Sequence, residues 1–362
     1  MNRKEAQALI EKYNRGEASP EETRLLENWF VSESAKQQAE PVNENYALIQ
    51  QEIWDRISAQ RSQPAKTRRL WPRIAAAASI LVMLSAGGFF LFKPKQQQLA
   101  KHDIPAGGNK AYITLAGGQR INVTDARTGL LAKQGHVQII KKADGKIAYE
   151  GKADLSNVYN TVSTPVSGQH SVILPDGTYV MLDAESSITF PVQFAPNKRE
   201  VKLSGHAWFV VKYNKQQPFS VLAGKTLVND LGTQFDLNAY PDEPAVTTTL
   251  VEGSVAVNHK TIIPGQQALV QDNQVSIAPA DTTAITAWKD GNFIFRNQDL
   301  KVTMRQLARW YGLTINYDHA PEHLQIGGNI SRSRNLSVVL AAMEQTGEVH
   351  FKLNGRELTV TQ

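Results

Sequence analysis

The chain has 362 residues, of which 41% are hydrophobic and 20% are charged, and its formal net charge is +5 at pH 7. This length allows two or three folded domains. Because the chain contains no cysteine, its composition excludes disulfides, a thiolate nucleophile and a cysteine-ligated metal site.

The first 63 residues have the pattern of a small helical domain. A helix is predicted over Lys4–Asn14, and Ser19-Pro20-Glu21-Glu22 is typical of a capping box with proline at the first position of a second helix. A third helix is predicted over residues 44–61, where isoleucines and a tryptophan recur at helical spacing. The proline-containing stretch that follows is typical of a linker.

The apolar side chains of this domain either form the core of a three-helix unit or line a surface for a cytoplasmic partner. So short a unit buries little surface and is marginal by itself, and two tryptophans are more than its core requires. We therefore favour a binding surface. Its candidate contact residues are Leu25, Leu26, Trp29, Phe30, Ile53, Trp54 and Ile57.

Residues 74–92 form an apolar stretch without a charged side chain. Its length matches the roughly 30 Å hydrocarbon core of a bilayer, which a helix crosses with about 20 residues. The basic linker 64–73, which contains Trp71, precedes the stretch, and Lys93-Pro94 follows it. A buried core helix is the alternative, but such flanks favour a transmembrane helix.

The basic linker also predicts the orientation of the chain. Because the denser positive cluster lies before the apolar stretch, the N-terminal domain is predicted to be cytoplasmic and the larger part to lie outside the cytoplasm. Anionic lipid headgroups explain the cluster, and the other lysines and arginines are dispersed along the chain. We therefore expect a single-pass protein in contact with the lipid bilayer and no direct contact with nucleic acid.

Past residue 95 the pattern changes to short β-type runs separated by turn glycines, so residues 95–287 are predicted to form an all-β domain of sandwich, roll or solenoid type. Residues 113–123 and 172–182 align without gaps, and each is predicted to be a hairpin with a two-residue, glycine-containing turn. Further strands are predicted at 200–203, 207–212, 219–222, 227–230, 235–239, 247–250, 254–258 and 267–271.

Residues 288–362 start a new pattern, with elements in the order β-α-β-β-α-β-β. Asp299 and Asn335 are predicted to cap two helices, which end at Gly312 and Gly347. We predict a compact two-layer α/β domain.

Ten motifs occur in order between residues 160 and 270. They are Thr164-Pro165, Leu174-Pro175-Asp176-Gly177-Thr178, Ala184-Glu185-Ser186-Ser187, Phe190-Pro191, Arg199-Glu200-Val201, Leu203-Ser204-Gly205-His206-Ala207-Trp208-Phe209, Pro218-Phe219, Leu231-Gly232-Thr233-Gln234-Phe235, Leu250-Val251-Glu252-Gly253-Ser254-Val255 and Pro264-Gly265-Gln266. Together they resemble the FecR family, single-pass anti-sigma factors that control extracytoplasmic-function sigma factors. Residues 100–160 resemble the less regular lead-in of that family. One departure is His206, where the family usually has glutamate. Any role of that glutamate in the family therefore cannot be assigned to this chain, although the predicted fold is unaffected.

The C-terminal pattern resembles the domain that follows the FecR region in Bacteroidetes-type members, on the residues Leu307-Ala308-Arg309-Trp310-Tyr311-Gly312. That domain is in turn similar to the secretin and TonB N-terminal signalling module. The resemblance implies a receptor-signalling role, with Arg309, Trp310, Tyr311 and Gly312 as candidate residues. Such a domain either binds a partner by adding a strand to a sheet edge or only packs against the β domain.

The resemblance implies an anti-sigma factor of the inner (cytoplasmic) membrane. It would sequester an extracytoplasmic-function sigma factor and respond, in the periplasm, to the signalling domain of a TonB-dependent outer-membrane receptor. The signal would cross the membrane either by a pull on the helix or through cleavage by membrane proteases. The small residues Ser85, Ala86, Gly87 and Gly88, which loosen a helix, mark the candidate cleavage region.

Two other classes of function stay open at this point. One is a membrane-tethered periplasmic glycan- or cell-wall-binding module without sigma binding, and the other is a periplasmic hydrolase. The sequence contains no phosphate loop or nucleophile elbow, and Pro321 breaks the helix that would aim His319 and His323 at one metal. We therefore expect no enzymatic activity, cofactor or metal site.

Overall fold

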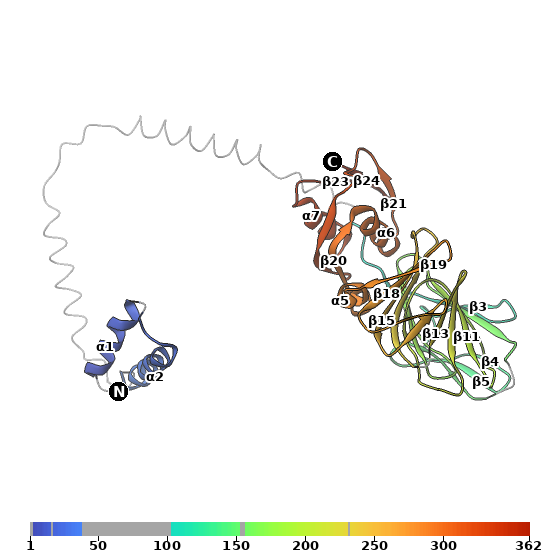
Figure 1. Cartoon of the computed structure of the whole chain (residues 1–362), viewed down its shortest axis with the longest axis horizontal. Helices are drawn as coiled ribbons and strands as arrows, with labels where there is room; N and C mark the ends of the chain where they lie inside the picture. The colour runs from blue at the N-terminus through green and yellow to red at the C-terminus, as the bar shows by residue number, and fades with distance from the viewer. Residues whose placement is uncertain (1–2, 16, 38–102, 153–155, 231) are drawn as a thin grey trace. The chain divides into compact units, whose positions relative to one another are not determined.

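The computed structural model describes residues 3–15, 17–37, 103–152, 156–230 and 232–362 (Figure 1). They belong to two compact units, Met1–Lys93 and Pro94–Gln362. The predicted third helix, the basic linker, the apolar stretch 74–92 and the candidate cleavage region lie outside the described residues. Among the helices that are described, none is both long and apolar enough to cross a membrane.

Two helices, α1 (Arg3–Asn14) and α2 (Pro20–Gln37), are described in the N-terminal unit, and both confirm the helices predicted there. The capping box forms as expected: the Ser19 amide donates to Glu22 Oε2 at 2.8 Å, and the Glu22 amide donates to Ser19 Oγ at 3.3 Å. Lys12 of α1 pairs with Glu22 at 2.6 Å. The side chain that starts α2 therefore also ties the two helices together.

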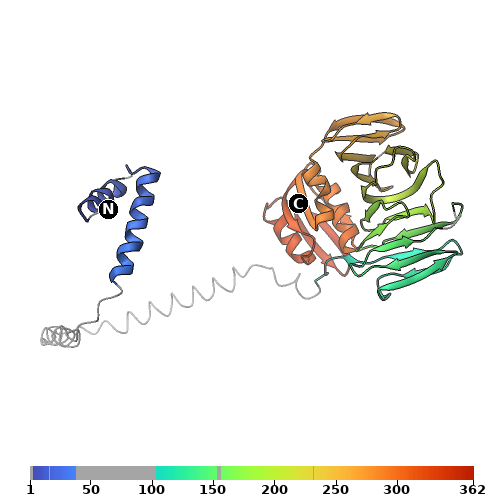
Figure 2. The ribbon, with the colours of Figure 1, turned by 90° about the horizontal axis from the view of Figure 1, so that it is seen from below.

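The second unit begins with a β domain of two long sheets with a shared hydrophobic core (Figure 2). In the first sheet the strand order is β3-β2-β7-β10-β11-β12-β13-β16-β17. In the second it is β4-β5-β6-β8-β9-β11-β14-β15-β18-β19. Residues alternate between buried and half-buried along β8, β12 and β13, so one face of each strand turns to the core.

These strands have the following bounds: β1 (Gly108–Asn109), β2 (Tyr112–Thr114), β3 (Arg120–Asn122), β4 (Gly129–Gln134), β5 (Val137–Lys141), β6 (Ile147–Glu150), β7 (Tyr159–Ser163), β8 (Gly168–Ile173), β9 (Tyr179–Leu182), β10 (Ser187–Pro191), β11 (Arg199–Val210), β12 (Phe219–Ala223), β13 (Thr226–Asp230), β14 (Gln234–Ala239), β15 (Val246–Glu252), β16 (Val255–Val257), β17 (Lys260–Ile262), β18 (Gln266–Gln271) and β19 (Gln274–Pro279). The all-β prediction for this part of the chain is confirmed.

Strand β11 belongs to both sheets. Its first half pairs with β10 and β12, and its second half pairs with β9 and β14. Gly205 lies between the halves with a φ of 90°, and a Cβ there would lie 2.5 Å from Ser186 Oγ. The position therefore requires glycine. The prediction of two strands separated by a turn at Gly205 was wrong, because the chain changes sheet there within one continuous strand.

The two similar hairpins both form, but their loops differ from the prediction in length. In the second hairpin the Leu174 amide donates to the Thr178 carbonyl and the Gly177 amide donates to the Leu174 carbonyl, both at 2.9 Å. The first hairpin repeats this pattern around Gly118. Both glycines have positive φ, 81° at Gly118 and 88° at Gly177. Each loop is thus a three-residue loop that ends in a left-handed glycine, not the two-residue turn predicted.

A connector of α5 (Thr282–Thr286) and the 3₁₀ turn η3 (Ala287–Asp290) leads to the α/β domain. That domain has the predicted order of elements, with its helices and strands around a second core. The strands form two small sheets, β20-β22 and β21-β24-β23. The elements are β20 (Asn292–Asp299), α6 (Leu300–Tyr311), β21 (Thr314–Tyr317), β22 (Gln325–Ser331), α7 (Leu336–Glu344), β23 (His350–Asn354) and β24 (Glu357–Thr361).

One predicted helix cap forms locally and the other does not. Asp299 Oδ1 accepts from the amides of Lys301 and Val302 at 2.8 and 3.3 Å, as expected for α6. Asn335 holds the cap position of α7, but its side chain makes no capping bond. Instead, Asp103 accepts from the Ser337 amide at 3.0 Å and from the Ser337 hydroxyl at 2.7 Å. The cap of α7 comes from the other end of the unit.

Asp103 belongs to a segment, residues 103–110, that we call the N-terminal arm. Ile104 lies 6% exposed in the core of the α/β domain, and its carbonyl accepts from the Leu336 amide at 3.0 Å. Further along the arm, β1 pairs in parallel with β8 of the β domain. The arm is therefore built into both domains of this unit.

Candidate functional site

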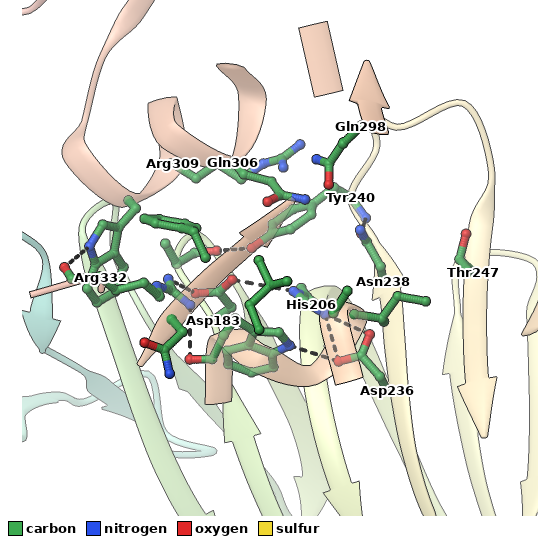
Figure 3. Close-up of a pocket in the computed structure, with 18 of the residues that line it drawn as sticks. Asp183, His206, Asp236, Asn238, Tyr240, Thr247, Gln298, Gln306, Arg309 and Arg332 are labelled. Carbon is green, nitrogen blue, oxygen red and sulfur yellow. Dashed lines mark hydrogen bonds and ion pairs between the residues drawn. The ribbon is translucent and has the colours of Figure 1, made fainter. Parts of the chain in front are cut away.

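The candidate site is a cavity of about 360 Å³ where the β domain, the connector and the α/β domain meet (Figure 3). The β domain contributes Asp183 after β9, His206 on β11, and Asp236 and Asn238 on β14, while Arg332 comes from the chain between β22 and α7. Because the lining side chains come from strands and helices of both domains, the shape of the cavity depends on how those domains pack.

A chain of ion pairs runs along one wall of this cavity. The Arg332 guanidinium donates to Asp183 Oδ1 at 2.5 Å, and Asp183 Oδ2 lies 3.4 Å from Nδ1 of His206. On the other side of the imidazole, Nε2 lies 2.9 Å from Asp236 Oδ2. The Trp288 indole donates to Asp236 Oδ1 at 2.8 Å. This network joins the β domain to the connector and to the α/β domain.

The network sets the charge of its members. Burial alone would lower the pKa of His206, but the neighbouring carboxylates of Asp236 and Asp183 raise that pKa to about 9. Burial alone would raise the pKa of the Asp183 carboxyl, but the Arg332 guanidinium and His206 hold it well below its usual range. His206 is therefore protonated near neutral pH. The glutamate that the FecR resemblance predicts at this position would instead bring three carboxylates together.

Aromatic rings pack around these charges. The His206 ring lies 4.6 Å from Trp288, measured between centroids. The Arg332 guanidinium lies 3.8 Å above the Trp310 ring, and the Trp310 indole donates to the Arg332 carbonyl at 2.8 Å. Tyr240 donates its hydroxyl to the Ala184 carbonyl, and burial raises its pKa well above the usual value. The rings cover much of the network, and the resulting low local dielectric strengthens its ion pairs.

A second ion-pair cluster fixes α6 to the loop after β14. Arg309 donates to Asp242 at 2.6 Å and to Glu243 at 3.0 Å. Arg305, one turn earlier, donates to Glu243 at 2.6 Å. The Arg309 guanidinium also lies 3.7 Å above the Tyr240 ring. The α/β domain is thus attached to the β domain through two separate charged clusters.

The structure places the predicted receptor-signalling residues inside the unit. Arg309 and Trp310 are 7% and 3% exposed and face the β domain and Arg332, while Tyr311 is fully buried and donates to the Arg334 carbonyl at 2.7 Å. Gly312 ends α6 with a φ of 70°. In this packing the side chains of Arg309, Trp310 and Tyr311 present little surface to a receptor. Their signalling role stays a prediction.

Of the predicted sigma-factor contacts, Leu25 on α2 is 60% exposed, and Leu26 and Trp29 are half-buried. The side chain of Phe30, and all of Ile53, Trp54 and Ile57, lie outside the described residues. Three apolar side chains that were not among the predicted contacts are also exposed: Ile10, Tyr13 and Val31 are 36%, 53% and 69% exposed. Helical spacing assigned Ile10 and Tyr13 to a face but could not show that this face is open.

Sequence reasoning singled out His206 but did not find its partners. Asp183, Asp236 and Arg332 are far apart in the chain and carry no local motif, so only the fold brings them together. Within the described part of the chain, no group of three or more acidic or histidine side chains is placed to hold a metal ion. Around His206, the carboxylates of Asp183 and Asp236 contact opposite ring nitrogens, so the three side chains do not converge on one point where a metal ion could sit.

The site therefore lies in a protein made of a two-sheet β domain joined by ion pairs to a small α/β domain. Two family models match these domains: "FecR protein" over residues 160–256 and "FecR, C-terminal" over residues 292–360. The chain belongs to the FecR family.

Solved structures share the fold. Two crystal structures of a candidate anti-sigma factor from Parabacteroides distasonis ATCC 8503, at 1.65 and 2.50 Å resolution, are 24% and 23% identical in sequence to this chain, each with a TM-score of 0.52. The similarity covers 56% of this chain and 98% and 99% of those chains. No curated protein matched the sequence.

Proposed function

We propose that this protein is a membrane-anchored anti-sigma factor. In this proposal α1 and α2 hold an extracytoplasmic-function sigma factor in the cytoplasm, residues 74–92 cross the inner membrane, and the β and α/β domains receive a signal in the periplasm. Membership of the FecR family supports the sigma-binding role. The signalling domain of a TonB-dependent receptor is the periplasmic partner that we propose.

The observation that carries this proposal is that both N-terminal helices expose apolar side chains. Ile10 and Tyr13 lie one turn apart on α1, and Leu25 and Val31 are more than half exposed on α2. Covering these side chains with a partner would remove apolar area from water, which favours binding. A sigma factor that packs on these side chains would be kept from RNA polymerase by occlusion.

The test is co-purification of the full-length chain with the sigma factor encoded nearest to it. Leu25→Glu would place a charge in the middle of an apolar contact, and we expect it to weaken the complex by a factor of ten or more, about 1.4 kcal/mol. Asn28→Glu is the matched control, because Asn28 is already exposed and polar on the same helix. A complex that Leu25→Glu leaves intact would exclude this surface, and failure to bind any sigma factor of the host would contradict the proposal.

The alternative is a tethered glycan-binding module without sigma binding. It would be preferred if the helices bound no sigma factor while the periplasmic unit retained a ligand.

A further inference from the structure

We propose that the cavity between the β and α/β domains binds an uncharged, hydroxyl-rich small molecule of the mono- or disaccharide class. Side-chain amides from both domains would hold it. This site is separate from the sigma-factor and receptor contacts proposed above, and either proposal can fail without the other.

The size and position of the cavity suit a small ligand. Its volume of about 360 Å³ lies in the range of about 300–1,000 Å³ that is typical of such sites, which occur preferentially at domain interfaces. Phe293, Ile285 and Ile294 supply apolar wall on the side of the connector and of β20. A ligand with C–H faces as well as polar groups would fit such a lining.

Several lining side chains have hydrogen-bonding capacity that the described protein does not use. Gln298 Nε2 is buried without a hydrogen-bond partner, and the side chains of Thr247, Gln267 and Gln306 make no hydrogen bond within the described residues. Asn238 accepts one bond at Oδ1, from the Tyr240 amide at 3.3 Å, which leaves its Nδ2 protons unused. In Figure 3, Gln298 and Gln306 come from the α/β domain, and Asn238 and Thr247 come from strands of the β domain.

The charges around the cavity argue for a neutral ligand. Asp183 is paired with Arg332, His206 with Asp236, and Arg309 with Asp242, each at 2.9 Å or less. Arg296 and Asp281 pair with each other at 3.6 Å. A charged ligand would have to break one of these pairs or remain without a counter-ion in a partly desolvated site.

The unused groups also specify what kind of neutral ligand is bound. Each side-chain amide offers two donor protons and one acceptor oxygen. A hydroxyl group both donates and accepts, so neighbouring hydroxyls can satisfy an amide in full, whereas an apolar molecule would leave buried amides unpaired at a cost of about 1–3 kcal/mol each. A bound molecule would bridge both domains and so stabilise their packing in proportion to its occupancy.

The test measures binding to the full-length chain in phospholipid nanodiscs, because sugar-based detergents would compete for the site. Glucose, maltose and N-acetylglucosamine are the uncharged probes, and glucosamine and glucuronate are their charged counterparts. By calorimetry we expect at least one uncharged probe to bind with a Kd of about 1 mM or less, and both charged probes to bind at least about tenfold more weakly than it does.

Two variants test whether the probe binds in the cavity. Gln298→Leu and Gln306→Leu keep the approximate shape of the side chain but remove its hydrogen bonds, and each should weaken binding by about tenfold. Gln138→Leu, at an exposed position of β5, is the matched control and should bind as the parent does. Thermal unfolding without ligand shows whether each variant is folded. If no uncharged probe binds at about 50 mM, or if both cavity variants bind as the parent does, the proposal is wrong and the cavity holds only water.

Discussion

His206 shows how one residue can join two domains through its charge. Its imidazole lies between a carboxylate that also binds Arg332 of the α/β domain and one that also binds Trp288 of the connector. Because both contacts favour the protonated ring, the ring stabilises the folded unit only while it carries its proton. The same geometry makes the packing of the two domains dependent on pH.

The pKa of His206, about 9 when folded against 6.5 for the ordinary group, fixes the direction of that dependence. Its contribution to stability is complete below pH 6.5 and is lost as the pH rises through 9. A rise in the pKa from 6.5 to about 9 corresponds to about 3 kcal/mol of stability. Since each kcal/mol moves the midpoint by about 2–4 °C, we expect the thermal midpoint of residues 94–362, followed in the full-length chain by tryptophan fluorescence, to fall by about 6–12 °C over this range. In His206→Gln this alkaline fall should be absent.

His170 is the control for this measurement. Burial and nearby Lys141 lower the pKa of His170 to about 4, so its effect on stability appears only as the pH falls below 6.5. His170→Gln should therefore leave the fall of the thermal midpoint at alkaline pH unchanged. An alkaline fall that persists in His206→Gln would show that other groups cause it.

At the scale of the element, α7 begins on a cap that the sequence places far away. The Asp103 carboxylate and Ser337 are 234 residues apart, yet they make both capping bonds. We expect Asp103→Ala to destabilise the α/β domain by about 1 kcal/mol, the usual effect of losing a cap, and to speed hydrogen exchange of the Ser337 amide. Asn335→Ala should cost less, because that side chain makes no capping bond. Equal effects of the two changes would argue against the distant cap.

Elements were predictable where their signals are local. The capping box of α2 and the Asp299 cap of α6 involve bonds within three residues, so the sequence specifies them directly. The continuous β11 was missed because Gly205 has the same sequence signature in a turn and at a change of sheet. Strands β4 to β6 were not predicted either, because lysines and glutamines interrupt the apolar alternation of β4 and β5 and β6 is only four residues long. Pairing with neighbouring strands, rather than pattern, defines them.

The whole molecule is proposed to span the inner membrane, and the absence of cysteine makes its orientation testable. Ser32→Cys and Ser276→Cys each introduce a single thiol at an exposed position. With a membrane-impermeant maleimide added to cells whose outer membrane has been opened, we expect labelling of Ser276→Cys in intact inner membranes. Labelling of Ser32→Cys should require detergent. The reverse pattern would invert the proposed orientation, and equal labelling of both would contradict a single membrane crossing between them.

The N-terminal arm also affects the order in which this protein can be made. The arm leaves the ribosome before the domain whose core it completes, since Ile104 and Asp103 bind residues near the end of the chain. At about 5–20 residues per second, roughly 10–50 s separate the synthesis of the two partners. During that interval the β domain can fold, but Ile104 has no core to enter. The α/β domain can therefore complete its fold only after translation has nearly ended, on an arm that the β domain already holds through β1.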